Sequence, residues 1–205
     1  STVLKTLFGL LTPRQGKIRL NGDDITGATQ KDLLARGIAF VPQGRNLFGQ
    51  LSVYENLELG GITLGMKTTH ARIPEVLEFF PRVKERMNSL ASSLSGGEQK
   101  QLEIGRALLL RPKVLLIDEP SIGLSPMVVQ DVFKLLRKLA DQGTTVLMVE
   151  QNVKSALKYS DDAIALESGR LVLHKSAAEI LADPQMERLF LGGAHTTTAA
   201  TATSV

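Results

Sequence analysis

The sequence predicts an α/β protein in which a mostly parallel β-sheet is flanked by helices. Two stretches, "KVLLIDEP" at 113–120 and "TTVLMVEQN" at 144–152, contain the apolar runs that are typical of strands. A helical pattern lies between them, over 127–140. Strands that are apolar along their whole length indicate a sheet covered on both faces, and such sheets are mostly parallel.

The composition is that of a globular protein without cysteine chemistry. The chain has 205 residues, enough for one domain with a subdomain, and 43% of them are apolar and 22% charged. It contains no cysteine, which excludes disulfides and zinc–thiolate sites. A net charge of +3 indicates no strong attraction to nucleic acid or to a membrane surface. No apolar run approaches the ~20 residues of a membrane-spanning helix.

Four short elements are expected in the first quarter of the chain. Residues 2–11 predict a helix with one apolar side, formed by Val3, Leu4, Leu7, Leu10 and Leu11. Alternation over 17–25 around Asn21-Gly22 predicts a hairpin. A short helix is expected at 30–37, ended by Gly37, and a short strand at 38–44, stopped by Pro42.

The middle of the chain is largely helical in pattern over 52–90, most clearly at 73–87, and again at 98–110. A helical stripe follows at Val128, Val132, Leu135, Leu136 and Leu139. Two strands are expected around Ser168-Gly169, and two short helices near 176–182 and 185–191. The tail at 194–205 lacks large apolar residues and is expected to be disordered.

Two carboxylates close the strand at 114–118. In an open α/β sheet, ligands bind beyond the carboxyl ends of the strands, where Asp118 and Glu119 are placed. One carboxylate could hold Mg²⁺, and the next could orient or activate a water. The alternative, from these two residues alone, is a strand that ends in solvated acids.

The segment "LSGGEQKQ" at 94–101 predicts a helix start that binds an anion. Ser95 and Glu98 have the spacing of a capping box, which accounts for those two residues without any ligand. It does not account for Gly96 and Gly97, which are poor helix formers in the first turn. Glycines let an anion approach the free N–H groups and the positive end of the helix dipole.

These motifs together resemble the ATP-binding subunits of ABC transporters. "LSGGEQ" at 94–99 is similar to the family's signature motif, "VLLIDEP" at 114–120 to its Walker B strand, "VPQG" at 41–44 to its Q-loop and "SIGLSP" at 121–126 to its D-loop. The resemblance covers residues 1–193. It implies a P-loop NTPase-like ATPase domain over 1–193, with a helical subdomain at about 48–110 that carries the signature motif.

The family resemblance implies ATP and Mg²⁺ as ligands and assigns roles to single residues. Asp118, Ser1 and Gln43 would hold the metal, and Thr2 would lie near the phosphates. Glu119 would polarise the attacking water, and Gln151 occupies the position where the family usually has a switch histidine. Ser95, Gly96, Gly97 and Glu98 would contact the nucleotide of a partner chain, as would Ser125, at a position where the family usually has an aspartate.

The resemblance also implies the partners and the location. A second ABC ATPase subunit would pack head-to-tail against this one. The pair would bind transmembrane permease subunits, which receive the solute from a periplasmic solute-binding protein. The chain would lie peripherally on the cytoplasmic face of the inner membrane and bind no nucleic acid. "PQGRNLFGQLSVYENLELGG" at 42–61, "MVEQN" at 148–152 and "ADPQMERLFLGG" at 182–193 resemble the branch that imports branched-chain amino acids, or the similar urea importers.

The opening "STVLKTLFGLL" resembles the second half of a Walker A motif. We therefore expect the glycine loop, its lysine and two or three strands of the family domain to precede Ser1. Without a G-x-x-x-x-G-K-[ST] loop, this chain alone is expected to hydrolyse ATP poorly. The alternative function is accordingly an ABC-fold fragment that does not bind nucleotide.

Overall fold

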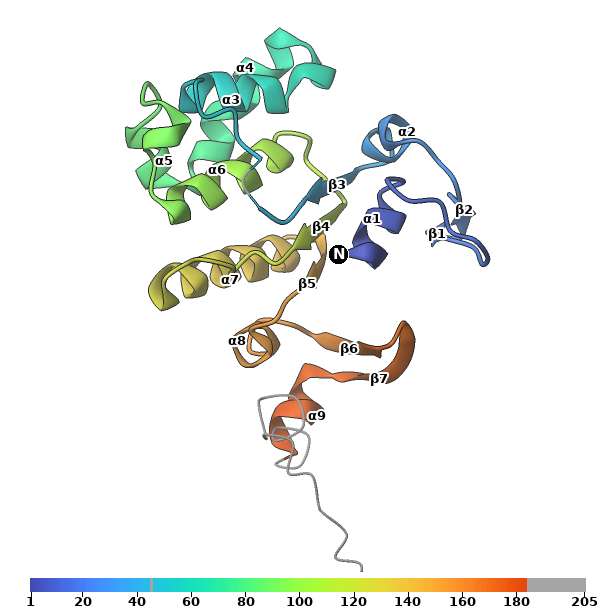
Figure 1. The fold of residues 1–205 in the computed structure, drawn as a ribbon. Helices are drawn as coiled ribbons and strands as arrows, with labels where there is room; N and C mark the ends of the chain where they lie inside the picture. Colours follow the sequence, from blue (N-terminus) through green and yellow to red (C-terminus); the bar gives the residue numbers. More distant parts are fainter. Residues whose placement is uncertain (45, 184–205) are drawn as a thin grey trace, which may run out of the picture. The chain divides into compact units, whose positions relative to one another are not determined.

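The computed structural model describes residues 1–44 and 46–183. The chain forms two compact units, Ser1–Gln151 and a second that begins at Asn152. The first unit contains the parallel sheet and most helices (Figure 1). The helix expected at 185–191 and the disordered tail expected at 194–205 lie outside the described residues.

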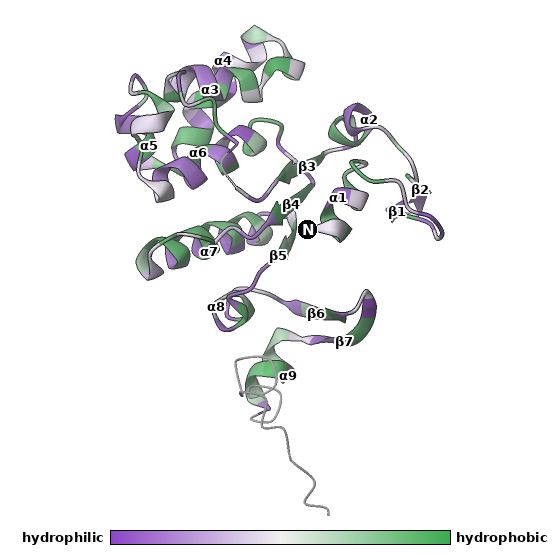
Figure 2. Ribbon diagram, viewed as in Figure 1, coloured by the Kyte–Doolittle hydropathy of each residue, from purple (hydrophilic) through white to green (hydrophobic). Residues whose placement is uncertain are grey.

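The sheet of the first unit is parallel, as predicted. Its strands β3 (Ile38–Val41), β4 (Val114–Asp118) and β5 (Thr145–Val149) stand in the order β3-β4-β5. They are the most uniformly hydrophobic part of the unit (Figure 2). Val41 pairs with Ile117, and Asp118 with Val149, so the three carboxyl ends meet at one edge of the sheet.

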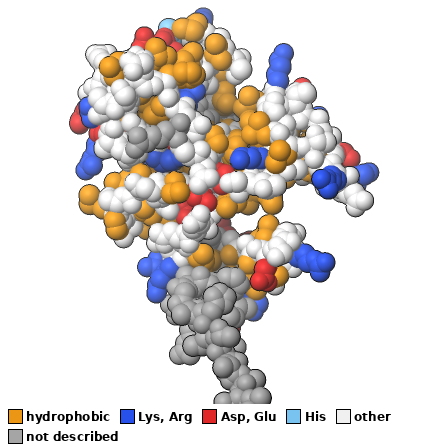
Figure 3. Space-filling model, viewed as in Figure 1, with side chains coloured by type: hydrophobic (Ala, Val, Ile, Leu, Met, Phe, Trp, Pro, Cys, Tyr) orange, Lys and Arg blue, Asp and Glu red, His pale blue; other side chains and the backbone are white. Residues whose placement is uncertain are grey.

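The connection from β3 to β4 is a group of helices that pack on one another (Figure 1). They are α3 (Val53–Gly60), η1 (Ile62–Leu64), α4 (Met66–Leu77), α5 (Pro81–Glu85), η2 (Ala91–Ser93) and α6 (Gly96–Leu108). Gly105 lets α6 approach its neighbours, because a Cβ there would lie 3.3 Å from Phe80 and 3.4 Å from Val76. Large apolar side chains are also exposed over this group (Figure 3).

The clearest helical pattern in this group, 73–87, is broken in the structure. α4 ends at Leu77 and α5 begins at Pro81. Phe80, at φ −133° and ψ 67°, has left the helical conformation. Proline disfavours the helical conformation in the residue before it, so Pro81 divides an otherwise continuous apolar pattern.

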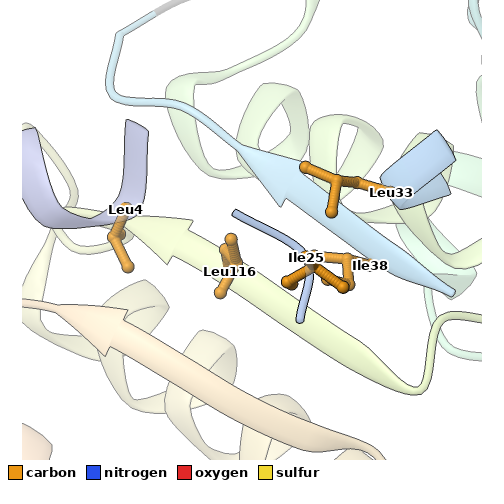
Figure 4. Close-up of a cluster of buried hydrophobic side chains, with 5 residues drawn as sticks. All are labelled: Leu4, Ile25, Leu33, Ile38 and Leu116. Atoms are coloured by element: carbon orange, nitrogen blue, oxygen red, sulfur yellow. The ribbon is translucent and has the colours of Figure 1, made fainter. Parts of the chain in front are cut away.

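Helix α1 (Thr2–Leu7) packs its one buried residue, Leu4, against the sheet. Leu4 joins Ile25, Leu33, Ile38 and Leu116 in one hydrophobic cluster (Figure 4). The neighbouring elements are the predicted hairpin of β1 (Arg19–Leu20) and β2 (Asp23–Asp24), and helix α2 (Gln30–Ala35). Asn21 and Gly22 both have positive φ, as the two-residue hairpin turn requires.

The prediction of one helix over 2–11 is wrong in its second half. α1 ends at Leu7, and Gly9 turns the chain with φ +69°. A Cβ at Gly9 would lie 2.6 Å from the Ala28 carbonyl oxygen, so only glycine fits this turn. Val3, Leu10 and Leu11 are exposed, contrary to the predicted apolar side.

Helix α7 (Pro126–Asp141) connects β4 to β5 and matches the predicted helix. Its buried stripe is shifted by a residue in places: Val129 and Phe133 are buried, whereas Val128 and Leu135 are half-buried. β5 is less covered than its apolar sequence predicts. Thr145 and Leu147, which share one face of the strand, are exposed, so the described residues cover mainly the other face.

The second unit contains the predicted pair of strands. β6 (Asp162–Glu167) and β7 (Arg170–Ser176) are antiparallel and joined by Ser168-Gly169, both with positive φ. The flanking helices are α8 (Val153–Leu157) and α9 (Ala177–Ala182), the latter close to the predicted bounds. Leu157, Ala177 and Ile180 form the buried cluster of this unit.

Candidate functional site

Three predicted site residues from three different strands meet at the carboxyl edge of the sheet. The Gln43 side-chain amide follows β3 and donates to Glu119 Oε2 at 2.8 Å. The Gln151 amide follows β5 and donates to Glu119 Oε1, also at 2.8 Å. The Glu119 carboxylate is thus held by one amide on each side. The parallel register brings these residues together although they are 76 and 32 residues apart in sequence.

The backbone of Glu119 has a conformation that is uncommon for this residue type. Its φ is +47°, in the left-handed region, where residues other than glycine are seldom found. Its N–H donates to the Val149 carbonyl at 2.8 Å, which ties the turn after β4 to β5. Such backbone strain persists where the surroundings enforce it, and it gathers at functional sites.

Asp118 is fully buried at the end of β4. Among the described residues, neither of its carboxylate oxygens has a hydrogen-bond partner. The backbone nitrogen of Ser1 lies 3.5 Å from Oδ1, so the start of α1 adjoins this carboxylate. The Ser1 hydroxyl does not cap α1. A buried carboxylate whose oxygens accept no hydrogen bond from the described residues, next to the residue that begins α1, fits a hard cation such as Mg²⁺, which prefers oxygen ligands.

Glu150 is a site residue that the sequence analysis missed. Its Oε1 accepts the Ser121 N–H at 2.8 Å, which fastens the segment after β4 to the end of β5. The only sequence signal was its place at the end of an apolar strand, and that signal does not distinguish it from any solvated acid.

The start of α6 has the predicted capping box. The Glu98 N–H donates to Ser95 Oγ at 3.4 Å, and the Ser95 N–H donates to Glu98 Oε2 at 2.8 Å. Burial raises the pKa of Glu98, but the hydrogen bonds from Ser95 and the nearby Arg86 outweigh it, so the pKa lies below its usual value. The carboxylate therefore stabilises this helix start in its charged form.

Ser95→Ala is expected to lower the free energy of unfolding by about 1 kcal/mol at neutral pH, because it removes the cap. The folded-state pKa of Glu98 is depressed, so its contribution is present above the ordinary value of 4.5 and is lost as the pH falls through the lowered pKa. Urea unfolding at pH 7 and pH 3 measures the effect. The difference in free energy of unfolding between the wild type and Ser95→Ala should be smaller at pH 3 than at pH 7. Ser92→Ala, at an exposed serine outside the cap, is the control; an equal loss there would contradict the assignment.

The two glycines at this helix start have different reasons to be glycine. A Cβ on Gly97 would lie 2.6 Å from Val128 Cγ1, so Gly97 is required by the packing of α6 against α7. A Cβ on Gly96 would meet only Leu124 Cδ2, at 3.8 Å. Packing alone therefore explains why residue 97 is glycine, without the expected role in anion binding. Packing within the described residues does not explain why residue 96 is glycine.

Gly97→Ala is expected to destabilise the protein by about 1–3 kcal/mol, whereas Gly96→Ala should be neutral or slightly stabilising. The added methyl at Gly97 overlaps Val128, whose branched side chain has little freedom to move. Urea unfolding measures both variants. Val128→Ala in the Gly97→Ala background should recover most of the loss, and failure to recover it would contradict the packing argument.

Ser125 begins α7 and is exposed, and its side chain makes no capping hydrogen bond. The residues after it pack beside the start of α6, through Leu124 against Gly96 and Val128 against Gly97. The structure thus gathers the predicted site residues into two groups. The first consists of Ser1, Gln43, Asp118, Glu119 and Gln151; the second consists of Ser95, Gly96, Gly97, Glu98 and Ser125. Thr2 is exposed in the first turn of α1, directly after Ser1.

A parallel sheet with an acidic carboxyl edge, joined to a helical group that presents a glycine-rich helix start, defines the class of α/β nucleotide-binding proteins. Within that class, the chain belongs to the ABC transporter family. The family's model, "ABC transporter", matches residues 1–122.

Known members of the family align with most of this chain. The "high-affinity branched-chain amino acid transport ATP-binding protein BraG" of Pseudomonas aeruginosa is 44% identical over 193 residues, 94% of this chain and 83% of that protein. The "probable branched-chain amino acid transport ATP-binding protein LivF" of Archaeoglobus fulgidus is 39% identical, over 94% of this chain and 82% of its own length. The crystal structure of the ADP conformation of MJ1267, an ATP-binding cassette of an ABC transporter, has a TM-score of 0.81 at 26% identity, covering 94% of this chain and 83% of that one.

Proposed function

We propose that the protein is the ATP-binding and ATP-hydrolysing subunit that energises import of branched-chain amino acids through an ABC transporter. The observation that carries the proposal is the Glu119 carboxylate, held by Gln43 and Gln151 beside the buried Asp118, whose oxygens accept no hydrogen bond from the described residues. Membership of the ABC transporter family supports the ATPase role, and the names of two of the relatives support the choice of solute.

In this proposal, Asp118, Ser1 and Gln43 hold Mg²⁺, and Thr2 contacts the phosphates. The metal, when bound, neutralises charge on the phosphate oxygens of ATP. Asp118 contributes a fully buried carboxylate and Ser1 a hydroxyl at the start of α1. Mg²⁺ is usually held by one or two carboxylates together with waters and substrate phosphates, so this small set of protein ligands suffices.

Glu119 orients the attacking water and accepts its proton. The two amides that hold the carboxylate restrict its position, and positioning is most of what a protein contributes to phosphoryl transfer. Gln151 stands where a histidine is usual in the family. Its amide N–H donates to Glu119 here, and an amide can also donate to a phosphate oxygen, although it carries no charge.

The second group of site residues serves the nucleotide of a partner subunit. Ser95, Gly96, Gly97 and Glu98 form the start of the 13-residue helix α6, and its free N–H groups attract an anion. Gly96 leaves the backbone accessible there. Ser125 faces the same partner at the start of α7. Two such subunits, identical or different, pair head-to-tail.

The helical group is the surface that contacts the transmembrane permease subunits. It exposes the large apolar residues Ile62, Met66 and Leu90, and the segment just before it exposes Phe48 (Figure 3). Within the described residues, no helix has the length and apolar character to cross a bilayer. The subunit lies peripherally on the cytoplasmic face of the inner membrane. It acts on the solute only through the permease, which receives the solute from a periplasmic binding protein.

Uptake of labelled leucine by cells that carry or lack the gene tests the proposal. We expect deletion to abolish high-affinity uptake, and a plasmid copy of the wild-type gene, but not the Glu119→Gln gene, to restore it. Labelled urea is the control solute. Loss of urea uptake with normal leucine uptake would assign the protein to a urea importer. Uptake of both solutes that does not depend on the gene would overturn the proposed role in import.

A further inference from the structure

The loop after β3, which carries Gln43, is fastened to α6 by two charged residues, the buried Glu103 and the half-buried Arg106. We propose that Glu103 is a positioning residue: it holds this loop through Asn46 and thereby places the Gln43 amide against Glu119. The inference deepens the proposed ATPase function and rests on it. It adds a residue from the interior of α6 to a site otherwise built from strand ends and the start of α1.

Glu103 belongs to a buried ion pair within α6. Lys100 Nζ lies 2.6 Å from Glu103 Oε2, and the two side chains are only 6% and 5% exposed. An ion pair between residues three apart in a helix normally lies at the surface and contributes little. Burying two charges is unfavourable unless their remaining hydrogen-bonding capacity is used. The second oxygen of Glu103 therefore matters for the role of the pair.

That second oxygen points out of the helix to the loop. Glu103 Oε1 accepts the backbone N–H of Asn46 at 2.7 Å. Arg106, one turn further along α6, donates from Nη1 to the Asn46 carbonyl oxygen at 2.6 Å. Both backbone groups of Asn46 are thus bound by α6. Lys100 orients the Glu103 carboxylate for this contact.

The side chain of Asn46 connects this anchored position to the backbone of Gln43. Its side-chain amide lies 3.3 Å from the Gln43 carbonyl oxygen and 3.4 Å from that of Pro42, and donates to both. The Gln43 side chain in turn donates to Glu119. An ion pair and three hydrogen bonds therefore connect Lys100 through Glu103, Asn46 and Gln43 to the proposed catalytic carboxylate.

Two double variants separate positioning from a merely structural role. Lys100→Met with Glu103→Gln removes both charges and keeps an oxygen for the Asn46 N–H. Lys100→Met with Glu103→Leu removes the charges and that oxygen. Because both charges of the buried pair are removed together, neither Lys100 nor Glu103 is left as an unpaired charge, and both variants are expected to fold. Amide exchange at Asn46, followed by NMR in the full chain, should be at least about tenfold faster in the leucine variant, because an exposed or unpaired N–H exchanges readily.

Turnover in the assembled transporter gives the second measurement. We expect kcat to fall about tenfold in the leucine variant, with KM for ATP unchanged, and to remain near the wild-type value in the glutamine variant. Asn46→Ala, a change at an exposed residue, should lower kcat in the same direction without touching the buried pair. It keeps the proposal testable if either double variant does not fold.

Equal exchange rates at Asn46 in the two double variants would overturn the anchoring role of Glu103. Faster exchange with unchanged kcat would overturn the positioning role and leave the proposed ATPase function intact. A wild-type transporter without Glu119-dependent turnover would overturn the ATPase function and the positioning role with it.

Discussion

Glu119→Gln is expected to lower ATP turnover at least about 100-fold, because glutamine cannot accept the proton of the attacking water. The substitution keeps the volume of the side chain. In the wild type, the amides of Gln43 and Gln151 each donate to one oxygen of the Glu119 carboxylate. In the glutamine variant, one of these two donors faces an amide N–H group instead of an oxygen. Nucleotide binding should persist, since Glu119 is not among the groups proposed to hold the phosphates. Steady-state ATPase rates of the assembled transporter, with ATP-dependent dimerisation of the subunit measured by size exclusion, test both parts.

The matched control is Glu78→Gln. Glu78 is 70% exposed in the helical group and pairs with Lys84 rather than with a site residue. Its replacement should leave turnover and dimerisation at wild-type levels. Wild-type turnover in the Glu119→Gln protein, or loss of ATP binding with loss of turnover, would remove Glu119 from its proposed catalytic role.

Asp118→Asn is expected to have opposite effects on activity and on folding. Turnover that depends on Mg²⁺ should be lost, because the only buried carboxylate proposed as a metal ligand is gone. The metal-free fold should become more stable by about 1 kcal/mol, since a buried carboxylate that has no hydrogen-bond partner among the described residues, and only a 3.5 Å contact with the Ser1 backbone nitrogen, is replaced by a neutral amide. Thermal unfolding without Mg²⁺ measures the gain, and unfolding with Mg²⁺ and ATP measures the lost ligand stabilisation.

Asp131→Asn, at an exposed position on α7, is the control for the change of charge. It should alter neither the metal-free stability nor the response to Mg²⁺ with ATP. An Asp118→Asn protein that unfolds more easily without metal, yet retains its Mg²⁺-dependent turnover, would show that Asp118 is a structural residue.

Local patterns were sufficient for most elements of the fold. The apolar run of β4, the Asn21-Gly22 turn and the Ser95–Glu98 capping box depend on residues close in sequence, and each is present as predicted. The exceptions have steric causes. Pro81 breaks a helix that the apolar pattern continues, and Gly9 ends α1 where the Ala28 carbonyl leaves no space for a side chain. Apolar periodicity contains no information about such contacts.

Sequence patterns were enough to predict the class of sheet, the family resemblance and a set of candidate site residues, because motifs are short and strand and helix periods are local. How those residues contact one another depends on the tertiary structure. It paired Gln43 and Gln151 on Glu119, assigned Gly97 to packing against Val128, and connected Glu103 to the Gln43 loop. Each of these contacts joins residues at least 31 positions apart, as Gly97 and Val128 are (128 − 97 = 31). Strand register and helix packing set such contacts, and no local pattern encodes them.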